Sequence, residues 1–113
     1  MFPREQRIKK DTDFDRLFKK GAVQRGLVAD LRWIAIGLDK SRFGFMVSTA
    51  ISKKAVKRNA IRRQLTAVTK NLSPAIKGIY DILIVAKPAI AKCAVQEIEK
   101  HVQELFKKAK LIN

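Results

Sequence analysis

Several residue types that define whole classes of protein are scarce or absent in this sequence. It has one cysteine, Cys93, which excludes an internal disulfide, and it begins with no apolar leader, so a cytoplasmic protein is expected. No uninterrupted apolar run approaches the roughly 20 residues of a membrane span, and no membrane role is expected. Internal repeats and Pro/Gly/Ser-rich linkers are absent too. The 113 residues, 47% of them hydrophobic, therefore predict a single domain over 1–113 with one modest core.

The residue groupings that support catalysis or metal binding by a protein are also missing. His101 is the only histidine, and with Cys93 it cannot supply the several ligands of a zinc site. There is no glycine-rich phosphate loop, Ser-His-Asp set or paired-carboxylate arrangement. Asp11, Asp13 and Asp15 suggest a Mg²⁺ cluster, but a helix start, where the dipole favours anions, explains them more simply. We expect no catalytic residue and no metal site on this protein.

Acidic residues are absent from one long stretch of the chain. Lys and Arg total 25 against 10 acidic residues, a net charge of +15, and no Asp or Glu occurs between residues 40 and 80. Within that stretch, "KKAVKRNAIRRQL" at 53–65 carries six basic side chains. A solvated helix face usually interleaves Glu with these cations and gains a little stability from each pair, and this segment does not. Such an uncompensated block predicts a polyanionic partner, with nucleic acid the leading candidate.

Apolar spacing in the first half of the chain predicts one helix and a β-hairpin. In "DTDFDRLFKKG", at 11–21, Phe14 and Phe18 lie one helical turn apart on the same face. Alternating apolar residues predict strands at 27–38 and 42–48, and the intervening "DKS" indicates a turn. The two strands are expected to pair with each other.

The second half of the chain predicts two helices around a buried strand. Ile61, Leu65 and Val68 recur at helical spacing, which indicates an amphipathic helix over 53–70 with its basic residues beside the apolar seam. "YDILIVA", at 80–86, is typical of a buried strand. After Pro88 a last helix carries the apolar stripe Val95, Ile98, Val102, Leu105 and Phe106. The predicted order is α-β-β-α-β-α, an α+β fold built as a two-layer α-β sandwich.

The flank of the 53–70 helix has the chemistry of an RNA-binding surface. Guanidinium groups can bind phosphate through two hydrogen bonds, and an amide can reach a base edge or a sugar hydroxyl. The side chains predicted to contact nucleic acid are Lys53, Lys54, Lys57, Arg58, Asn59, Arg62 and Arg63. Phe14 and Phe18 fit two interpretations, because rings at this spacing can fill a core or can stack on unpaired bases.

The basic segment also resembles a known family. "AVKRNAIRR", at 55–63, is similar to the Arg-Asn-Arg signature helix of the bacterial ribonuclease P protein subunit. "IKKDTDFDRLFKKG" resembles that family's N-terminal helix, and "RFGFMVS" and "YDILIVAKPA" resemble the strands before and after the signature, so the likeness covers most of the chain. The sequence departs from the pattern at Ala60, in place of the second signature arginine, and at Thr66 and Ala67, where charged residues often stand. Thr49 and Ala50 likewise replace lysines common before the helix.

The resemblance implies a fold and a task. The family order is α-β-β-β-α-β-α, with a left-handed β-α-β crossover that the general right-handed rule would reject. Its members bind the catalytic ribonuclease P RNA and help it cleave the 5′ leader from precursor tRNA. The RNA holds the catalytic Mg²⁺, so this chain would be the non-catalytic subunit of an endoribonuclease, with no obligate protein partner. By position, the 53–70 helix would contact the catalytic RNA, and Phe14, Phe18 and the nearby Trp33 would line a cleft for the single-stranded leader.

One alternative keeps RNA binding without the processing role. A general or ribosome-associated RNA-binding protein would share the basic helix, although the chain has no aromatic strand of the kind that RRM domains use. A DNA-compacting protein is a third interpretation. Co-purification separates them, because a processing subunit retains one structured RNA and the others retain a mixture.

Overall fold

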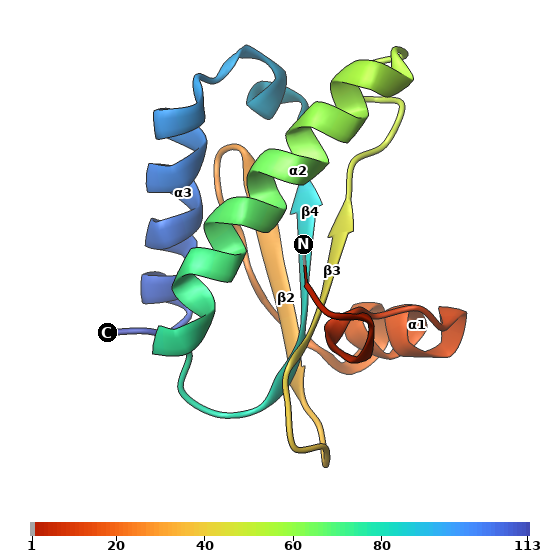
Figure 1. The fold of residues 1–113 in the computed structure, drawn as a ribbon, viewed down its shortest axis with the longest axis vertical. Helices are drawn as coiled ribbons and strands as arrows, with labels where there is room; N and C mark the ends of the chain where they lie inside the picture. The colour runs from red at the N-terminus through yellow and green to blue at the C-terminus, as the bar shows by residue number, and fades with distance from the viewer. Residues whose placement is uncertain (1) are drawn as a thin grey trace.

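The computed structural model describes residues 2–113 as a twisted four-stranded sheet with helices packed against it (Figure 1). Two long helices cross one face of the sheet, and a shorter helix near the N-terminus lies at one end of it. The helices are α1 (Asp11–Lys20), α2 (Ala55–Leu72) and α3 (Val95–Lys108), with short 3-10 turns η1 (Arg4–Gln6), η2 (Ser73–Ala75) and η3 (Pro88–Lys92). The strands are β1 (Ala22–Gln24), β2 (Ala29–Ala35), β3 (Arg42–Met46) and β4 (Tyr80–Ala86).

The strand order is β1-β2-β4-β3, so the last strand of the chain lies between two earlier ones. β4 pairs antiparallel with β2, where Leu31 faces Ile84, and parallel with β3, where Gly44 faces Leu83. The hairpin predicted from 27–38 and 42–48 is therefore wrong. The physical reason is that Ile82, Leu83 and Ile84 are all buried, on both faces of β4, and a strand apolar on both faces belongs at the centre of a sheet.

The connection from β3 through α2 to β4 is left-handed. In the view of Figure 1 both strands run upward, α2 crosses in front of the sheet, and β4 lies to the left of β3. The order α-β-β-β-α-β-α implied by the resemblance is thus confirmed, and the order drawn from apolar spacing lacks one strand. The missing strand is β1, whose three residues are too short and too exposed for alternation to reveal it.

The main core lies between the sheet and the two long helices. Ile61 and Leu65 of α2 and Val102 and Phe106 of α3 are buried there against Leu31 and its neighbours on β2 and β4. The apolar stripe predicted for the last helix is confirmed except at Val95, which is 50% exposed.

The opposite face of the sheet is covered less completely. Leu17 of α1 packs there with Ile8 and Leu83, and Phe14 lies against this small cluster. Met46, on the same face at the far end of β3, is 41% exposed. α1 therefore leaves part of this face open.

A buried ion cluster fixes α1 to the sheet. Arg42 of β3 donates two hydrogen bonds to Asp81 of β4, Nε to Oδ1 at 2.8 Å and Nη2 to Oδ2 at 2.7 Å, and lies 3.4 Å from Asp13 Oδ2. The bonds to Asp81 raise the pKa of the Arg42 guanidinium above its ordinary value. Asp13 is buried, so the interpretation of this residue as a simple helix-start anion was incomplete. It joins a three-residue charge network across two strands and a helix.

Candidate nucleic-acid interface

The basic residues of α2 extend along one flank of the helix and the loop before it. The side chains of Lys53, Lys54, Lys57 and Arg63 are exposed. Arg58 is half-buried, and its Nη1 donates to the Ser52 carbonyl oxygen at 3.0 Å, which ties the helix to the preceding loop. The helix itself begins at Ala55 and ends at Leu72, two residues later at each end than predicted from 53–70.

The next turn of α2 holds a pair of side chains that orient each other. Arg62 Nη1 donates to Asn59 Oδ1 at 2.7 Å. This contact holds the guanidinium along the helix surface while leaving its other N–H groups, and the NH₂ of Asn59, available to a ligand. Because the helix carries both residues one turn apart, their arrangement follows directly from the sequence spacing.

None of these cations is neutralised by a carboxylate. Within residues 2–113, the ion pairs use Arg16, Arg25, Arg42 and Lys87, and none involves the basic side chains at 53–63. The first turn of α2 has no acidic residue, so cations and free backbone N–H groups gather at the positive end of the helix dipole. That arrangement is unfavourable alone and becomes favourable when an anion binds.

A groove of about 660 Å³ lies beside this flank, between α2, β3 and the N-terminal segment. The segment reaches β3 because Ile8 N–H donates to the Phe43 carbonyl oxygen at 2.9 Å. The groove combines aromatic and cationic chemistry without a carboxylate. The aromatic and polar side chains at its surface include Phe2, Phe14, Phe43, Phe45, Arg7, Asn59, Arg62 and Arg63.

The three residues predicted to line a leader cleft do not lie together. Phe14 is half-buried between the small cluster and the groove, and Phe18 is 43% exposed, with the Arg32 guanidinium 4.6 Å from its ring centroid. Trp33 instead packs against the main core, on the α2 and α3 side of the sheet. The placement of Trp33 with the two phenylalanines is therefore wrong, because successive residues of a strand point to opposite faces and Arg32 takes the face of α1.

The position that departs from the signature faces another direction. Ala60 lies in a second groove, of about 490 Å³, between α2 and α3, together with Glu99 and Val95. Arg63 lines both grooves. An arginine at position 60 would thus point toward α3 and not into the groove that contains Arg62.

Sequence reasoning did not place Arg7, Phe2 and Phe45 beside the basic helix, where they line the groove. Arg7 and Phe2 precede the first helix, and only the pairing of their segment with β3 brings them beside α2. Phe45 was recognised as a strand residue, but local alternation does not reveal which helix borders it. No short-range signal in the sequence could have joined these residues to the basic helix.

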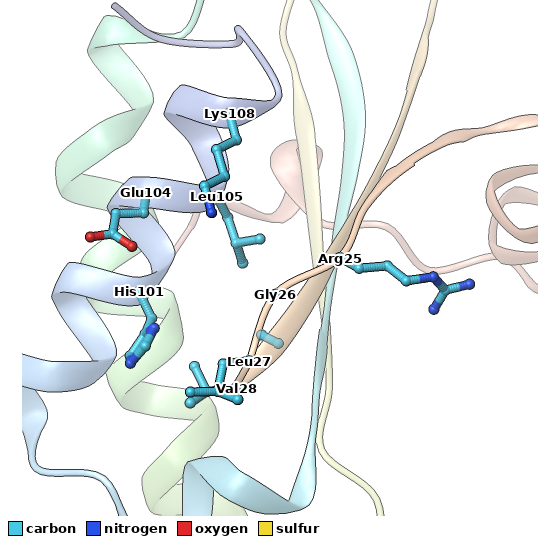
Figure 2. A pocket seen from close by; sticks show the side chains of 9 residues that line it. Arg25, Gly26, Leu27, Val28, His101, Glu104, Leu105 and Lys108 are labelled. Carbon is cyan, nitrogen blue, oxygen red and sulfur yellow. The ribbon is translucent and has the colours of Figure 1, made fainter.

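A third cavity contains the single histidine. It lies between the segment 25–29 and α3, where His101, Glu104 and Lys108 project from the helix, while Arg25 points away (Figure 2). Its volume of about 150 Å³ is below the range of about 300–1,000 Å³ typical of small-molecule sites. It has room for water and not for a nucleotide.

Over residues 2–113 no group of three or more His, Cys, Asp or Glu side chains is placed to hold a metal ion. No helix in that range is long and apolar enough to cross a membrane. Cys93 lies between η3 and α3, and partial burial, with a smaller effect of Glu97, raises the pKa of its thiol.

The fold and the interface define a class of protein: a small α+β domain whose crossover helix presents unneutralised cations, as nucleic-acid-binding proteins do. Within this class the chain belongs to the ribonuclease P protein family, because the family model described as Ribonuclease P matches residues 2–110. A general or ribosome-associated RNA-binding protein is not favoured by this match.

Individual relatives agree with the family. The chain is 32% identical to the ribonuclease P protein component of Synechocystis, over 98% of this chain and 90% of that one, and 32% identical to that of Syntrophomonas wolfei, over 98% and 92%. Among solved structures it resembles the Staphylococcus aureus RNase P protein, with a TM-score of 0.89 and 28% identity over 96% of this chain and 98% of that one. The RNase P protein of Thermotoga maritima, at 22% identity and a TM-score of 0.83 over 90% and 98%, shares the fold.

Proposed function

We propose that this chain is the protein component of ribonuclease P: it binds the ribonuclease P RNA and assists that RNA in removing the 5′ leader of precursor tRNA. The observation that supports this most directly is the flank of α2, where the helix with the family signature carries basic side chains that pair with no carboxylate. Lys53, Lys54, Lys57, Arg58, Asn59, Arg62 and Arg63 are the proposed RNA contacts.

These side chains divide into two kinds. Arg62 and Arg63 can contact phosphates with planar forks of N–H groups, whereas the three lysines act as mobile point charges near the helix N-terminus. Arg58 also holds the loop before the helix, so part of its hydrogen-bonding capacity is already used. Arg62 and Arg63 are therefore the residues whose removal should affect RNA binding most cleanly.

The open face beside α1 is the proposed surface for the leader. Phe18 is exposed there, and the Arg32 guanidinium lies 4.6 Å from its ring centroid. A single nucleotide could therefore contact both the ring and the guanidinium. Unpaired bases stack on such rings, and only a precursor tRNA has an unpaired leader to offer. Phe14 supports this surface from its half-buried position, and Trp33 takes no part.

The proposed chemistry belongs to the RNA. Mg²⁺ takes oxygen ligands, whereas the side chains of the α2 flank present positively charged nitrogen donors. They do not fit the metal, so we place the catalytic Mg²⁺ on the RNA and assign no catalytic residue to the chain. The proposed complex needs no second protein and no membrane, and cytoplasmic tRNA processing suits a chain with one unpaired cysteine.

The test compares the protein with and without RNA. Nuclease-free protein should not cleave precursor tRNA, and its addition to a bacterial ribonuclease P RNA should lower the Mg²⁺ concentration needed for leader removal, because bound cations replace part of the metal's screening. Cleavage at the tRNA junction by RNA-free protein, or an unchanged Mg²⁺ requirement, would contradict the proposal.

A further inference from the structure

We propose that the groove between α2, β3 and the N-terminal segment takes one unpaired nucleotide of the bound ribonuclease P RNA. Its base would lie against Phe45, and its phosphate would be held by Arg7 and Arg62. This inference rests on the proposed function, and it adds a binding site for a nucleotide to what would otherwise be only a contact with RNA phosphates.

The aromatic wall of the groove is already assembled. Phe2 stacks on Phe43 with ring centroids 4.2 Å apart and planes 13° apart, and Phe45 continues the set at 6.4 Å and 18° from Phe2. Phe2 and Phe43 are buried, whereas Phe45 and Phe14 are only half-buried. The first two rings therefore support the wall, and Phe45 presents the surface that a base can cover.

The polar side of the groove selects an anionic ligand. Arg62 is oriented by Asn59, Arg7 is exposed on the facing segment, and within residues 2–113 neither arginine forms an ion pair. The NH₂ of Asn59 can donate to a base edge. A site with an aromatic ring, an amide donor and two guanidinium groups that form no ion pair suits the base, the base edge and the phosphate of a nucleotide.

The shape of the groove favours a single nucleotide over a double helix. Its volume of about 660 Å³ lies in the range of small-ligand sites. β3 is an edge strand that pairs on its outer side only through the Arg7–Phe43 bridge among residues 2–113, so the floor beyond Phe43 is open. A duplex could contact the rim, but only an extruded base could reach the rings.

The experiment measures affinity for a bacterial ribonuclease P RNA in the absence of tRNA, so that no leader is present. Phe45→Leu should weaken binding about tenfold and leave the salt slope unchanged, because stacking is lost and charge is not. Arg7→Gln should make the log–log salt slope shallower by about 0.7–0.9, the value of one phosphate contact. Arg7 is exposed, so this variant does not depend on the core.

Arg4→Gln is the matched control for Arg7→Gln, because it removes a charge from the same N-terminal segment without touching the groove. It should bind the RNA as the unmodified protein does, and the unmodified protein is the control for Phe45→Leu. Chemical probing of the RNA should show one unpaired nucleotide that the unmodified protein protects and the Phe45→Leu variant does not, with folding of each variant checked by thermal unfolding.

The outcomes separate this inference from the proposed function. If Phe45→Leu and Arg7→Gln bind like their controls while Arg62→Ala binds more weakly, the groove holds no nucleotide and the helix flank remains the RNA contact. If the unmodified protein binds ribonuclease P RNA no more tightly than a mixed duplex RNA of equal length, the proposed function fails and the groove proposal fails with it.

Discussion

Arg42 and Arg62 are the same residue type in two opposite settings. Arg42 lies between a fully buried aspartate, Asp81, and a second buried aspartate, Asp13, and forms two hydrogen bonds to the first. The Arg62 guanidinium donates to the neutral amide of Asn59, and it forms no ion pair among residues 2–113. The first arginine is neutralised by the fold, and the second is not.

The difference shows how a basic sequence block should be interpreted. Both arginines belong to the stretch between residues 40 and 80 that has no acidic residue, and by sequence both count toward the cationic patch. Asp81 lies just beyond that stretch in sequence and directly opposite Arg42 across the β3–β4 pair. Charge counted along the chain therefore overstates the charge that the surface presents.

The largest expected effect on stability comes from removing Arg42, the arginine that is paired with buried aspartates. Arg42→Ala leaves Asp81 buried without its partner, and we expect the free energy of unfolding to fall by about 3–5 kcal/mol. Urea unfolding followed by circular dichroism measures this. Arg16→Ala is the matched control, because Arg16 is exposed and its contact with Asp13 is 3.9 Å long. A loss similar to that of the control would show that the cluster contributes little.

The two phenylalanines of α1 also differ in burial, and we expect their replacement to have different effects on stability. Phe14→Ala should lower the free energy of unfolding by about 2 kcal/mol, less than for a fully buried ring, because Phe14 is half-buried against the small cluster. Phe18→Ala should change stability by less than about 1 kcal/mol, since its main contact is the exposed one with Arg32.

For Phe18 the informative measurement is functional. The reconstituted enzyme should lose preference for precursor over mature tRNA, while affinity for the ribonuclease P RNA stays unchanged. A large fall in stability with an unchanged preference would assign Phe18 to the core instead.

Removing the unpaired arginine should affect binding and not folding. Arg62→Ala should make the salt dependence of RNA binding shallower by about 0.7–0.9 in log–log slope and weaken binding by about 1 kcal/mol. Lys107→Ala, an exposed cation on α3, should change neither value. Equal slopes for the two variants would place the interface elsewhere.

Arg58→Ala should weaken RNA binding in the same way and should also lower the free energy of unfolding by about 1 kcal/mol, because the hydrogen bond to the Ser52 carbonyl oxygen is lost.

The smallest effect is expected on the buried side of α2. Thr69 Oγ1 is buried and has no hydrogen-bond partner among residues 2–113. Thr69→Val keeps the shape of the side chain and removes the unsatisfied hydroxyl, so the free energy of unfolding should rise by up to about 1 kcal/mol. RNA affinity should not change. A less stable variant would mean that the hydroxyl is satisfied in solution.

The elements that could be predicted are those with a clear local signal. The strand predicted at 80–86 is confirmed. A short, continuous apolar run between loop residues is typical of a buried strand and is too short for a buried helix. The helices around Phe14, Leu65 and Val102 follow from their apolar spacing. β1 was missed because three exposed residues give no pattern, and the pairing of β2 with β4 was missed because no local rule states which strands meet.

The sequence by itself determined that one helix carries an apolar seam and a cationic flank, because helical periodicity and a missing set of acids are properties of neighbouring residues. It also determined the family, through the residues at 55–63 and their flanking segments. Only the tertiary structure decided which arginines are free, since Arg42 meets Asp81 and Asp13 across β4 and α1. The same holds for the groove, where Phe2 and Arg7 reach α2 only because their segment pairs with β3. These contacts join residues far apart in the chain, and their free energy depends on the packing of the whole sheet, which no short segment specifies.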